Sequence, residues 1–384
     1  MLLLALIAAS GCSLNDKNKS NGGQPEISAK STDKSAATEL GFPVSATKNT
    51  TRVAGADAAA DVAGAVSAVF PATSADNRPH AIAVVDERNW QGAIAAGVLM
   101  AKPLGIPTLL SSGGNLPAVS SDTLARLKPT GSALAGNAQI IRIGDDAGRP
   151  GVYRKAIIPG SDPYQVAAGV DKLFSVARGK PASNVIVTSG EQPGFAMPAA
   201  AWAARSGTSV LFVRQGAVPP ATRQALALHD KPNIWVLGPP SAVGPVVMKQ
   251  LRKLGKVTRI QGPSPVQNAI AFTRFGSHGF GWDINTPGQN FTLASTSRPA
   301  DAAAAAALAN GGVYAPLLVT DVARQLPPSL DSFFQDVQPG YQNNPNSGVF
   351  NHVWILGDAT TVSVEAQGRL DTITQLVPVE TAQP

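Results

Sequence analysis

The chain of 384 residues is poor in the side chains that build metal sites and catalytic centres. Its single cysteine, Cys12, excludes a disulfide within the chain. The four histidines show no spacing typical of zinc ligands, and they are His80, His229, His278 and His352. Neither a Gly-x-Ser-x-Gly nucleophile turn nor a Gly-x-x-x-x-Gly-Lys phosphate loop is present. We therefore expect a protein that is not an enzyme and that holds no metal and no cofactor.

Aromatic residues are also scarce, at 5%, and charged residues make up only 15% of the chain, whereas hydrophobic residues reach 44%. This is the composition of a globular protein, and the length suffices for two or three domains. The many alanines and glycines favour α/β layers that pack closely through small side chains.

Charge is distributed unevenly along the chain. Residues 150–275 contain 15 Lys and Arg against 4 Asp and Glu, whereas residues 276–384 contain 3 against 9. An asymmetry of this size indicates electrostatic partners or contacts between domains.

The N-terminus contains an apolar run, residues 1–9, that is too short to span a bilayer. It leads through Ala9-Ser10-Gly11 into Cys12, which is similar to the end of a bacterial lipoprotein signal, where the cysteine is lipidated. The alternative is a buried N-terminal helix with an incidental thiol. We predict a signal over residues 1–12, lipidation at Cys12, and a flexible linker over residues 13–48, which are rich in Ser, Asn, Lys and Thr.

The rest of the chain contains three copies of one unit. An opening motif places a glycine at positions 55, 160 and 262, and a closing motif of β-branched residues and glycine ends at positions 144, 238 and 357. We define the first copy as residues 49–150, the second as 151–256 and the third as 257–384. Short apolar runs alternate with helical patterns in each copy, and the runs lack polar alternation, as expected for strands covered on both faces. The pattern predicts an α/β fold of three tandem small doubly wound parallel-sheet domains.

These motifs resemble the cell wall-binding repeat 2 family, whose units read like RIAGADRYETA, NFPDALAA and APILLT. The first copy reads RVAGADAAADVA, NWQGAIAAG and IPTLLS at the matching places. The resemblance implies a pseudo-threefold arrangement of the domains and non-covalent binding to the cell wall. The family's Asp in NFPDA aligns with Gly92, Phe195 and Asp301, so only the third copy keeps it.

Ligands of open parallel sheets bind beyond the carboxyl ends of the strands. Several residues fall at such turns, but local roles explain them: Asp57 as a helix N-cap, and Gly144, Gly238 and Gly357 as tight strand exits. The acidic pairs Asp86-Glu87 and Asp145-Asp146 are interpreted as solvated loop charges. Four tryptophans are predicted to fill the Ala-rich core or the space between copies, and they are Trp90, Trp202, Trp235 and Trp354.

The basic second copy ends in a cluster at helical spacing, which consists of Lys249, Arg252, Lys253 and Lys256. Offsets of three, four and seven predict that these side chains share one face of a helix and its exit. We interpret the cluster as a candidate site for an anionic polymer. The alternatives are a solvated face and a surface that pairs with the acidic third copy.

The sequence thus predicts a non-catalytic, lipid-anchored protein on the outer face of the membrane or in the cell wall, which binds an anionic, teichoic-acid-like or polysaccharide wall polymer and no nucleic acid. The main alternative is a solute-binding lipoprotein of a transport system, which would show two lobes around a hinge. An enzyme that modifies the wall polymer is a further alternative.

Overall fold

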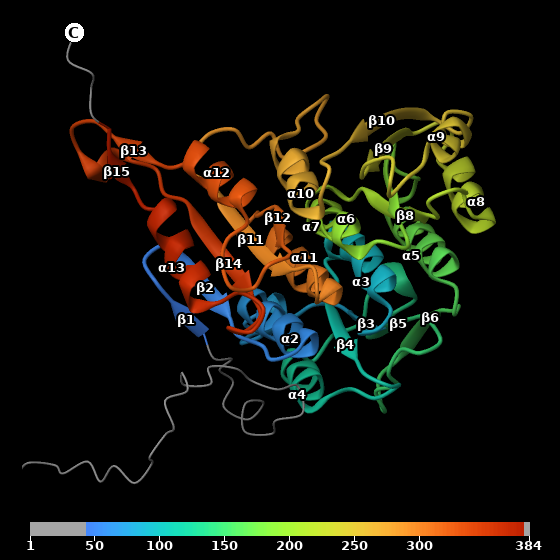
Figure 1. Cartoon of the computed structure of the whole chain (residues 1–384). Helices are drawn as coiled ribbons and strands as arrows, with labels where there is room; N and C mark the ends of the chain where they lie inside the picture. The colour runs from blue at the N-terminus through green and yellow to red at the C-terminus, as the bar shows by residue number, and fades with distance from the viewer. Residues whose placement is uncertain (1–43, 380–384) are drawn as a thin grey trace, which may run out of the picture.

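The computed structural model describes residues 44–379, which form three largely parallel β-sheets covered by helices (Figure 1). This confirms the predicted α/β fold with repeated doubly wound domains. Cys12, the predicted signal and most of the predicted linker lie outside the described residues. No helix of residues 44–379 is long and apolar enough to cross a bilayer.

Each sheet has four parallel strands in the same order, and the third sheet has one strand more. The first sheet runs β4 (Thr108–Ser111), β3 (Ile82–Asp86), β5 (Ile140–Ile143), β6 (Lys155–Ile158). The second runs β8 (Ser209–Val213), β7 (Asn184–Ser189), β9 (Asn233–Leu237), β10 (Lys256–Ile260). The third runs β12 (Leu317–Thr320), β11 (Asn290–Ser295), β14 (His352–Leu356), β2 (Thr50–Val53), β1 (Val44–Ala46), with β1 antiparallel to β2. The two central strands of the first sheet are buried at every position because helices cover both faces.

Every sheet takes its fourth strand from a different copy. The second copy opens with β6, which pairs with β5 of the first copy, and the third copy opens with β10, which pairs with β9 of the second. The first copy opens with β2, which pairs with β14 near the other end of the chain. The sheet therefore differs from the sequence repeat by one strand, and the three units close into a ring.

The helix after each opening strand returns to its own copy. These helices are α2 (Ala58–Val69), α5 (Pro163–Arg178) and α10 (Pro265–Arg274), and they pack against β4, β8 and β12. The side chain of Asp57 caps α2 by accepting the N–H of Ala60 at 2.9 Å, which confirms its predicted role as N-cap. Asp162 and Ser264 cap α5 and α10 in the same way. Each copy therefore contributes its opening strand to the sheet of one unit and the following helix to the sheet of the next, and this pair of elements joins neighbouring units around the ring.

Helices with many small residues meet at the centre of this pseudo-threefold arrangement. They are α3 (Trp90–Ala96) with the 3₁₀ turn η2 (Gly97–Met100), α7 (Pro198–Ser206), and α11 (Ala302–Asn310). All but the last residue of α11 are buried. A Cβ atom on Gly97 would lie 2.8 Å from the carbonyl oxygen of Ala200, so these backbones approach too closely for a larger side chain. Close packing of these helices accounts for the alanines and glycines at the centre.

Aromatic side chains instead fill the contact between the second and third copies. A turn of the third copy buries Phe280, which stacks on Trp235 of the second copy with ring centroids 4.2 Å apart. Trp202 packs edge-on against both Phe280 and Trp282, and Trp90 of the first copy packs against Phe212 of the second. The prediction that tryptophans fill the core or the space between copies is confirmed at these positions.

The outer helices differ between copies. Helices α4 (Ala118–Leu127), α8 (Pro220–Leu228) and α12 (Pro328–Asp336) are equivalent, and each has a proline as its N-cap. A further helix follows the closing strand in the second copy, α9 (Pro245–Leu251), and in the third, α13 (Val364–Ile373). Residues 144–154 of the first copy contain no helix at this place. The third copy alone adds the small sheet of β13 (Gly340–Tyr341) and β15 (Val377–Pro378).

A buried arginine fixes the turn after the closing strand of the third sheet. Arg52 on β2 is 3% exposed, and its guanidinium donates to the carbonyl oxygens of Gly357 (2.8 Å), Asp358 (3.0 Å) and Val362 (2.7 Å). Burial lowers the pKa of Arg52 to about 10, a shift that nearby carboxylates oppose, so it stays charged at neutral pH. The contact links β2 to a turn more than 300 residues later.

The equivalent contact takes a different form in each of the other two sheets. In the second sheet, Arg259 on β10 donates to the carbonyls of Gly238 and Val243. In the first sheet, Ile157 occupies this position on β6, and Arg142 on β5 donates to Ala147 instead. A guanidinium is thus kept at each turn, although its place in the sequence changes.

We predict that Arg52→Ala lowers the free energy of unfolding by about 3 kcal/mol, because several buried carbonyls lose their donor. Chemical denaturation followed by circular dichroism measures the change. The control is Arg259→Ala, since Arg259 is more exposed and makes fewer of these bonds. An equal loss in the two variants would show that Arg52 contributes no more to stability than Arg259 does.

Candidate functional site

The predicted basic cluster lies at the end of the second sheet. Lys249 belongs to α9, but this helix ends at Leu251; Arg252 and Lys253 lie in the following turn, and Lys256 begins β10. The four residues therefore do not share one helical face. The last turn of the helix tightens, because the N–H groups of Lys253 and Leu254 donate to the carbonyls of Gln250 and Leu251, three residues back. All four basic side chains are exposed.

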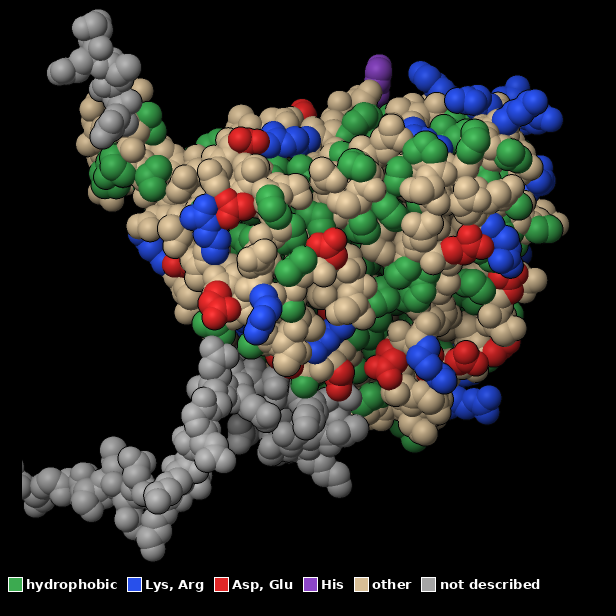
Figure 2. All heavy atoms as spheres, in the orientation of Figure 1, with side chains coloured by type: hydrophobic (Ala, Val, Ile, Leu, Met, Phe, Trp, Pro, Cys, Tyr) green, Lys and Arg blue, Asp and Glu red, His purple; other side chains and the backbone are tan. Residues whose placement is uncertain are grey.

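Lys and Arg side chains gather over α9 and its neighbours at the upper right of the space-filling view (Figure 2). We call Lys249, Arg252, Lys253 and Lys256 the basic surface. None of these four side chains has a hydrogen-bond or ion-pair partner within residues 44–379, and so none pairs with the acidic third copy. Arg259 lies close by, and its pKa is lowered by burial and by the charge of Arg252. The basic surface thus keeps its charge available to an anion from outside.

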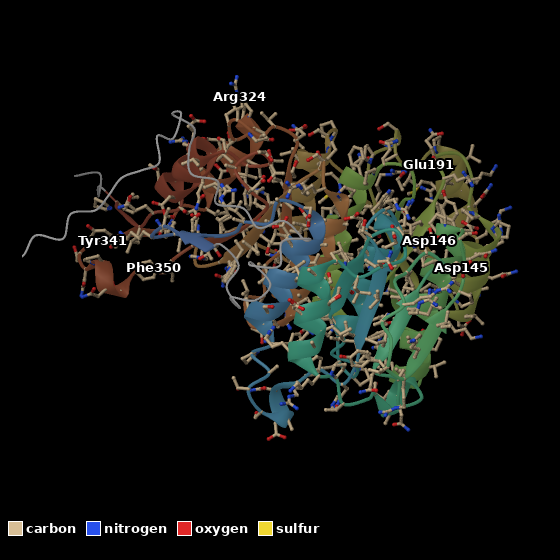
Figure 3. All side chains as sticks on the ribbon, turned by 90° about the horizontal axis from the view of Figure 1, so that it is seen from below. Asp145, Asp146, Glu191, Arg324, Tyr341 and Phe350 are labelled. Carbon is tan, nitrogen blue, oxygen red and sulfur yellow. The ribbon has the colours of Figure 1, made fainter. Side chains whose placement is uncertain are left out.

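The acidic pairs of the first copy do not form a two-carboxylate device. Asp86 is 1% exposed, so its interpretation as a solvated charge is wrong. It accepts bonds from Arg88 (2.8 Å) and from the N–H of Gly113 (3.0 Å); burial alone would raise its pKa, but these bonds lower it. Asp145 and Asp146 are exposed loop residues on the same side of the molecule as Glu191 (Figure 3).

The histidines lie apart from one another, and residues 44–379 contain no group of acidic, histidine or cysteine side chains that could hold a metal ion. His229 is the one that resembles a catalytic group, since its Nε2 lies 3.0 Å from both carboxylate oxygens of Asp171. Its Nδ1 faces the carbonyl of Ala182 at 2.7 Å. Burial lowers the pKa of His229, but these acceptors outweigh burial and raise it. An imidazole with an acceptor at both nitrogens is protonated and is not available as a base.

A charged cluster that the sequence did not predict lies at the carboxyl ends of the third sheet. Asp61 on α2 is fully buried, and its Oδ1 accepts the N–H groups of Gly55 (2.8 Å) and Gly357 (3.0 Å). Arg298 donates to Asp61 Oδ2 at 3.2 Å and to Asp358 Oδ1 at 3.3 Å. The cluster therefore joins the first and third copies where the ring closes.

Asp301 completes this cluster. It is fully buried, and neither of its carboxylate oxygens has a hydrogen-bond partner among the described residues. Burial raises the pKa of Asp301 to about 7, with Arg298 opposing and Asp57 and Asp358 adding to the shift. Burial, and then the charge of Asp301, also raise the pKa of Asp61 well above its usual value. A proton on one of the two carboxyl groups lowers the repulsion between these buried acids.

The other two sheets fold without these charges. In the first sheet the equivalent positions hold Val166, Asn89 and Gly92, and in the second they hold Asn268, Gln192 and Phe195. Asn268 accepts the N–H of Gly262, as Asp61 accepts that of Gly55. Counting six residues from each opening glycine would have identified Asp61 as the one acidic residue of the three. The charges of the third sheet are therefore not a requirement of the fold.

The fold is shared with bacterial proteins of known structure. The chain is similar to Cwp6 from Clostridium difficile, with 16% identity and a TM-score of 0.67 over 85% of this chain and 48% of that chain. It is similar to Cwp8 from Clostridium difficile, with 16% identity and a TM-score of 0.65 over 85% of this chain and 52% of that chain. It thus spans about half the length of these two proteins. No protein-family model matches the chain, and no curated protein matches it.

The buried pair Asp61 and Asp301 predicts a pH dependence. Because the folded chain holds a proton on Asp301 more tightly than the unfolded chain does, the free energy of unfolding falls as pH rises from about 4, where an unfolded aspartate titrates, to about 7. An asparagine at this position cannot titrate, so we expect the free energy of unfolding of Asp301→Asn to fall less between pH 5 and pH 8 than that of the parent. Denaturation midpoints at both pH values measure the difference. His229 also loses its stabilising proton as pH rises, but equally in both proteins. Parallel curves for the two proteins would contradict a protonated Asp301.

Proposed function

We propose that this protein is a non-catalytic lipoprotein of the cell surface that binds an anionic cell-wall polymer non-covalently. The observation that carries the proposal is the basic surface, four exposed cations without a partner among the described residues, on a fold shared with two cell-wall proteins. A polymer that carries phosphate or uronate groups meets several such cations at once, and weak contacts then add up to a useful affinity.

The architecture supports a binding role more than transport of a solute. A solute receptor of two lobes closes around its ligand by a hinge. Here three sheets close into one ring, and small-residue helices pack tightly at its centre. A continuous buried core of this kind favours a rigid body that presents its surface to a large ligand.

We predict that reversing Lys249, Arg252, Lys253 and Lys256 to Glu together weakens binding to isolated cell walls at least tenfold, since each exposed contact contributes roughly 0.2–1 kcal/mol. Co-sedimentation at several salt concentrations measures this. Exposed charges are screened over about 8 Å at physiological salt, so binding of the parent should also weaken as salt rises.

The matched control reverses four other exposed cations of the second copy, Lys172, Arg178, Lys180 and Arg223, with the same change in net charge. This control should retain binding. If both variants bind like the parent, the basic surface is not the binding site. If the parent itself does not sediment with walls, or if walls stripped of secondary polymers bind it equally, the proposed ligand is wrong.

The proposed anchor rests on the sequence around Cys12. Two acyl chains on this residue would hold the protein on the membrane almost permanently, since each buried CH₂ contributes roughly 0.8 kcal/mol. We predict that Cys12→Ser, expressed behind a complete secretion signal, shifts the protein from the membrane fraction to the soluble fraction. Unchanged membrane retention would argue against lipidation.

A further inference from the structure

The first copy contains a pocket where the other copies place a helix. In the third copy α13 packs against α12, which is the equivalent of α4. In the first copy, the loop 144–154 takes the place of this helix, and a pocket of about 460 Å³ opens between the loop and α4. Its volume lies within the range of about 300–1,000 Å³ that is typical of small-molecule sites.

Hydrogen bonds from buried residues fix the loop that forms one wall of the pocket. Arg142 is 8% exposed and donates to the carbonyls of Ala147 (2.7 Å) and Gly148 (3.1 Å) at the base of the loop. The N–H of Gly148 donates to Ser111 Oγ at 2.8 Å, which ties the loop to the end of β4. A site that is formed before the ligand arrives loses little entropy on binding.

The opposite wall is a tight turn after β4. Gly113 and Gly114 both have positive φ, +58° and +82°, and the backbones of Ser112 and Asn115 bond to each other across the turn at 2.9 and 3.1 Å. Positive φ favours glycine, so this turn is specified by the sequence Gly113-Gly114. It presents Asn115 and Leu116 to the pocket.

The lining combines one cation, one aromatic ring and one amide. Arg149, Tyr153 and Asn115 line the pocket, and their side chains have no hydrogen-bond or ion-pair partner among the described residues. Leu124 contributes an apolar floor. A free guanidinium binds carboxylate or phosphate, and an aromatic ring packs against the apolar face of a sugar.

The two acidic residues of the loop 144–154 interact with groups outside the pocket lining. Asp145 accepts the N–H of Gly160 at 3.1 Å, and Asp146 lies near enough to Arg88 to contribute to its raised pKa. Arg149, in contrast, lies near Arg142 and adds to the lowering of its pKa by burial. Among the residues that line the pocket, Arg149 is the one with a charged side chain.

We propose that this pocket binds one or two anionic sugar units, a uronate or a sugar phosphate. Arg149 pairs with the acidic group, Tyr153 packs against the ring, and Asn115 bonds to hydroxyl groups. The inference rests on the proposed function, because the pocket would hold one unit of the polymer at short range while the basic surface attracts the chain at long range.

Calorimetric titration of the purified protein with trigalacturonate, glucose 1-phosphate and neutral maltotriose tests the proposal. We expect one or both anionic probes to bind and maltotriose to bind at least tenfold more weakly. Arg149→Gln should reduce the affinity for the anionic probe about tenfold or more, as expected for the loss of a charged hydrogen bond.

A second variant tests the pocket sterically. Gly151 lines the pocket, and no atom lies within 4 Å of a Cβ atom placed on it, so the backbone tolerates a side chain here. We expect Gly151→Trp, which adds a large side chain at the pocket wall, to weaken binding at least tenfold with an unchanged denaturation midpoint. The control is Arg178→Gln, an equal change in charge at an exposed position outside the pocket.

The outcomes separate the two proposals. Parent affinity in both pocket variants, or no binding of either anionic probe, overturns the pocket. If the parent sediments with cell walls, and the pocket variants both sediment and bind the anionic probe like the parent, the wall-binding function is supported and the pocket proposal is wrong. If the parent binds an anionic probe through Arg149 but does not sediment with walls, the pocket stands and the wall-binding function falls.

Discussion

The pairing of β2 with β14 is the contact on which the rest of the molecule depends. It joins the first described strands of the chain to the last of the three large sheets, and Arg52 secures it by bonding to the turn that follows β14. Without it the third sheet would lose its fourth strand, and α2 would have no fixed place beside α11. The closed ring also brings α11 of the third copy against both α7 and α2 at the centre.

The three copies act as controls for one another. Each sheet keeps a guanidinium at the turn after its closing strand, although it comes from Arg52, Arg142 or Arg259, so this contact belongs to the fold. The buried charges around Asp301 occur in the third sheet only, and the pocket beside Arg149 follows from a helix that only the first copy lacks. Features confined to one copy are not needed for folding, because the other two copies fold without them, and they are therefore the better candidates for a functional role.

Charge in this protein is used in two different ways. At the closure of the ring, Arg298 pairs with Asp61 and Asp358 beside the buried Asp301, and burial raises the pKa of both Asp61 and Asp301. On the second copy, the cations of the basic surface are exposed and screened, and they have no partner in the described chain. The first arrangement binds the protein to itself, and the second leaves charge for another molecule.

The sequence by itself determined the strands, most of the helices, the threefold repetition and the Asp57 cap, because apolar runs, helical periodicity and capping are properties of neighbouring residues. Only the tertiary structure decided which sheet receives each opening strand, since the choice of a partner strand leaves no local pattern, least of all for β2 and β14 at opposite ends of the described chain. The same reason hid the contact of Asp61 with Arg298 and the burial of Asp86. The early end of α9 is a local change of hydrogen bonding that residue spacing alone did not reveal, and it moved the basic cluster off a single helical face. The pocket was equally out of reach, because it is the space left by a helix that two other copies possess.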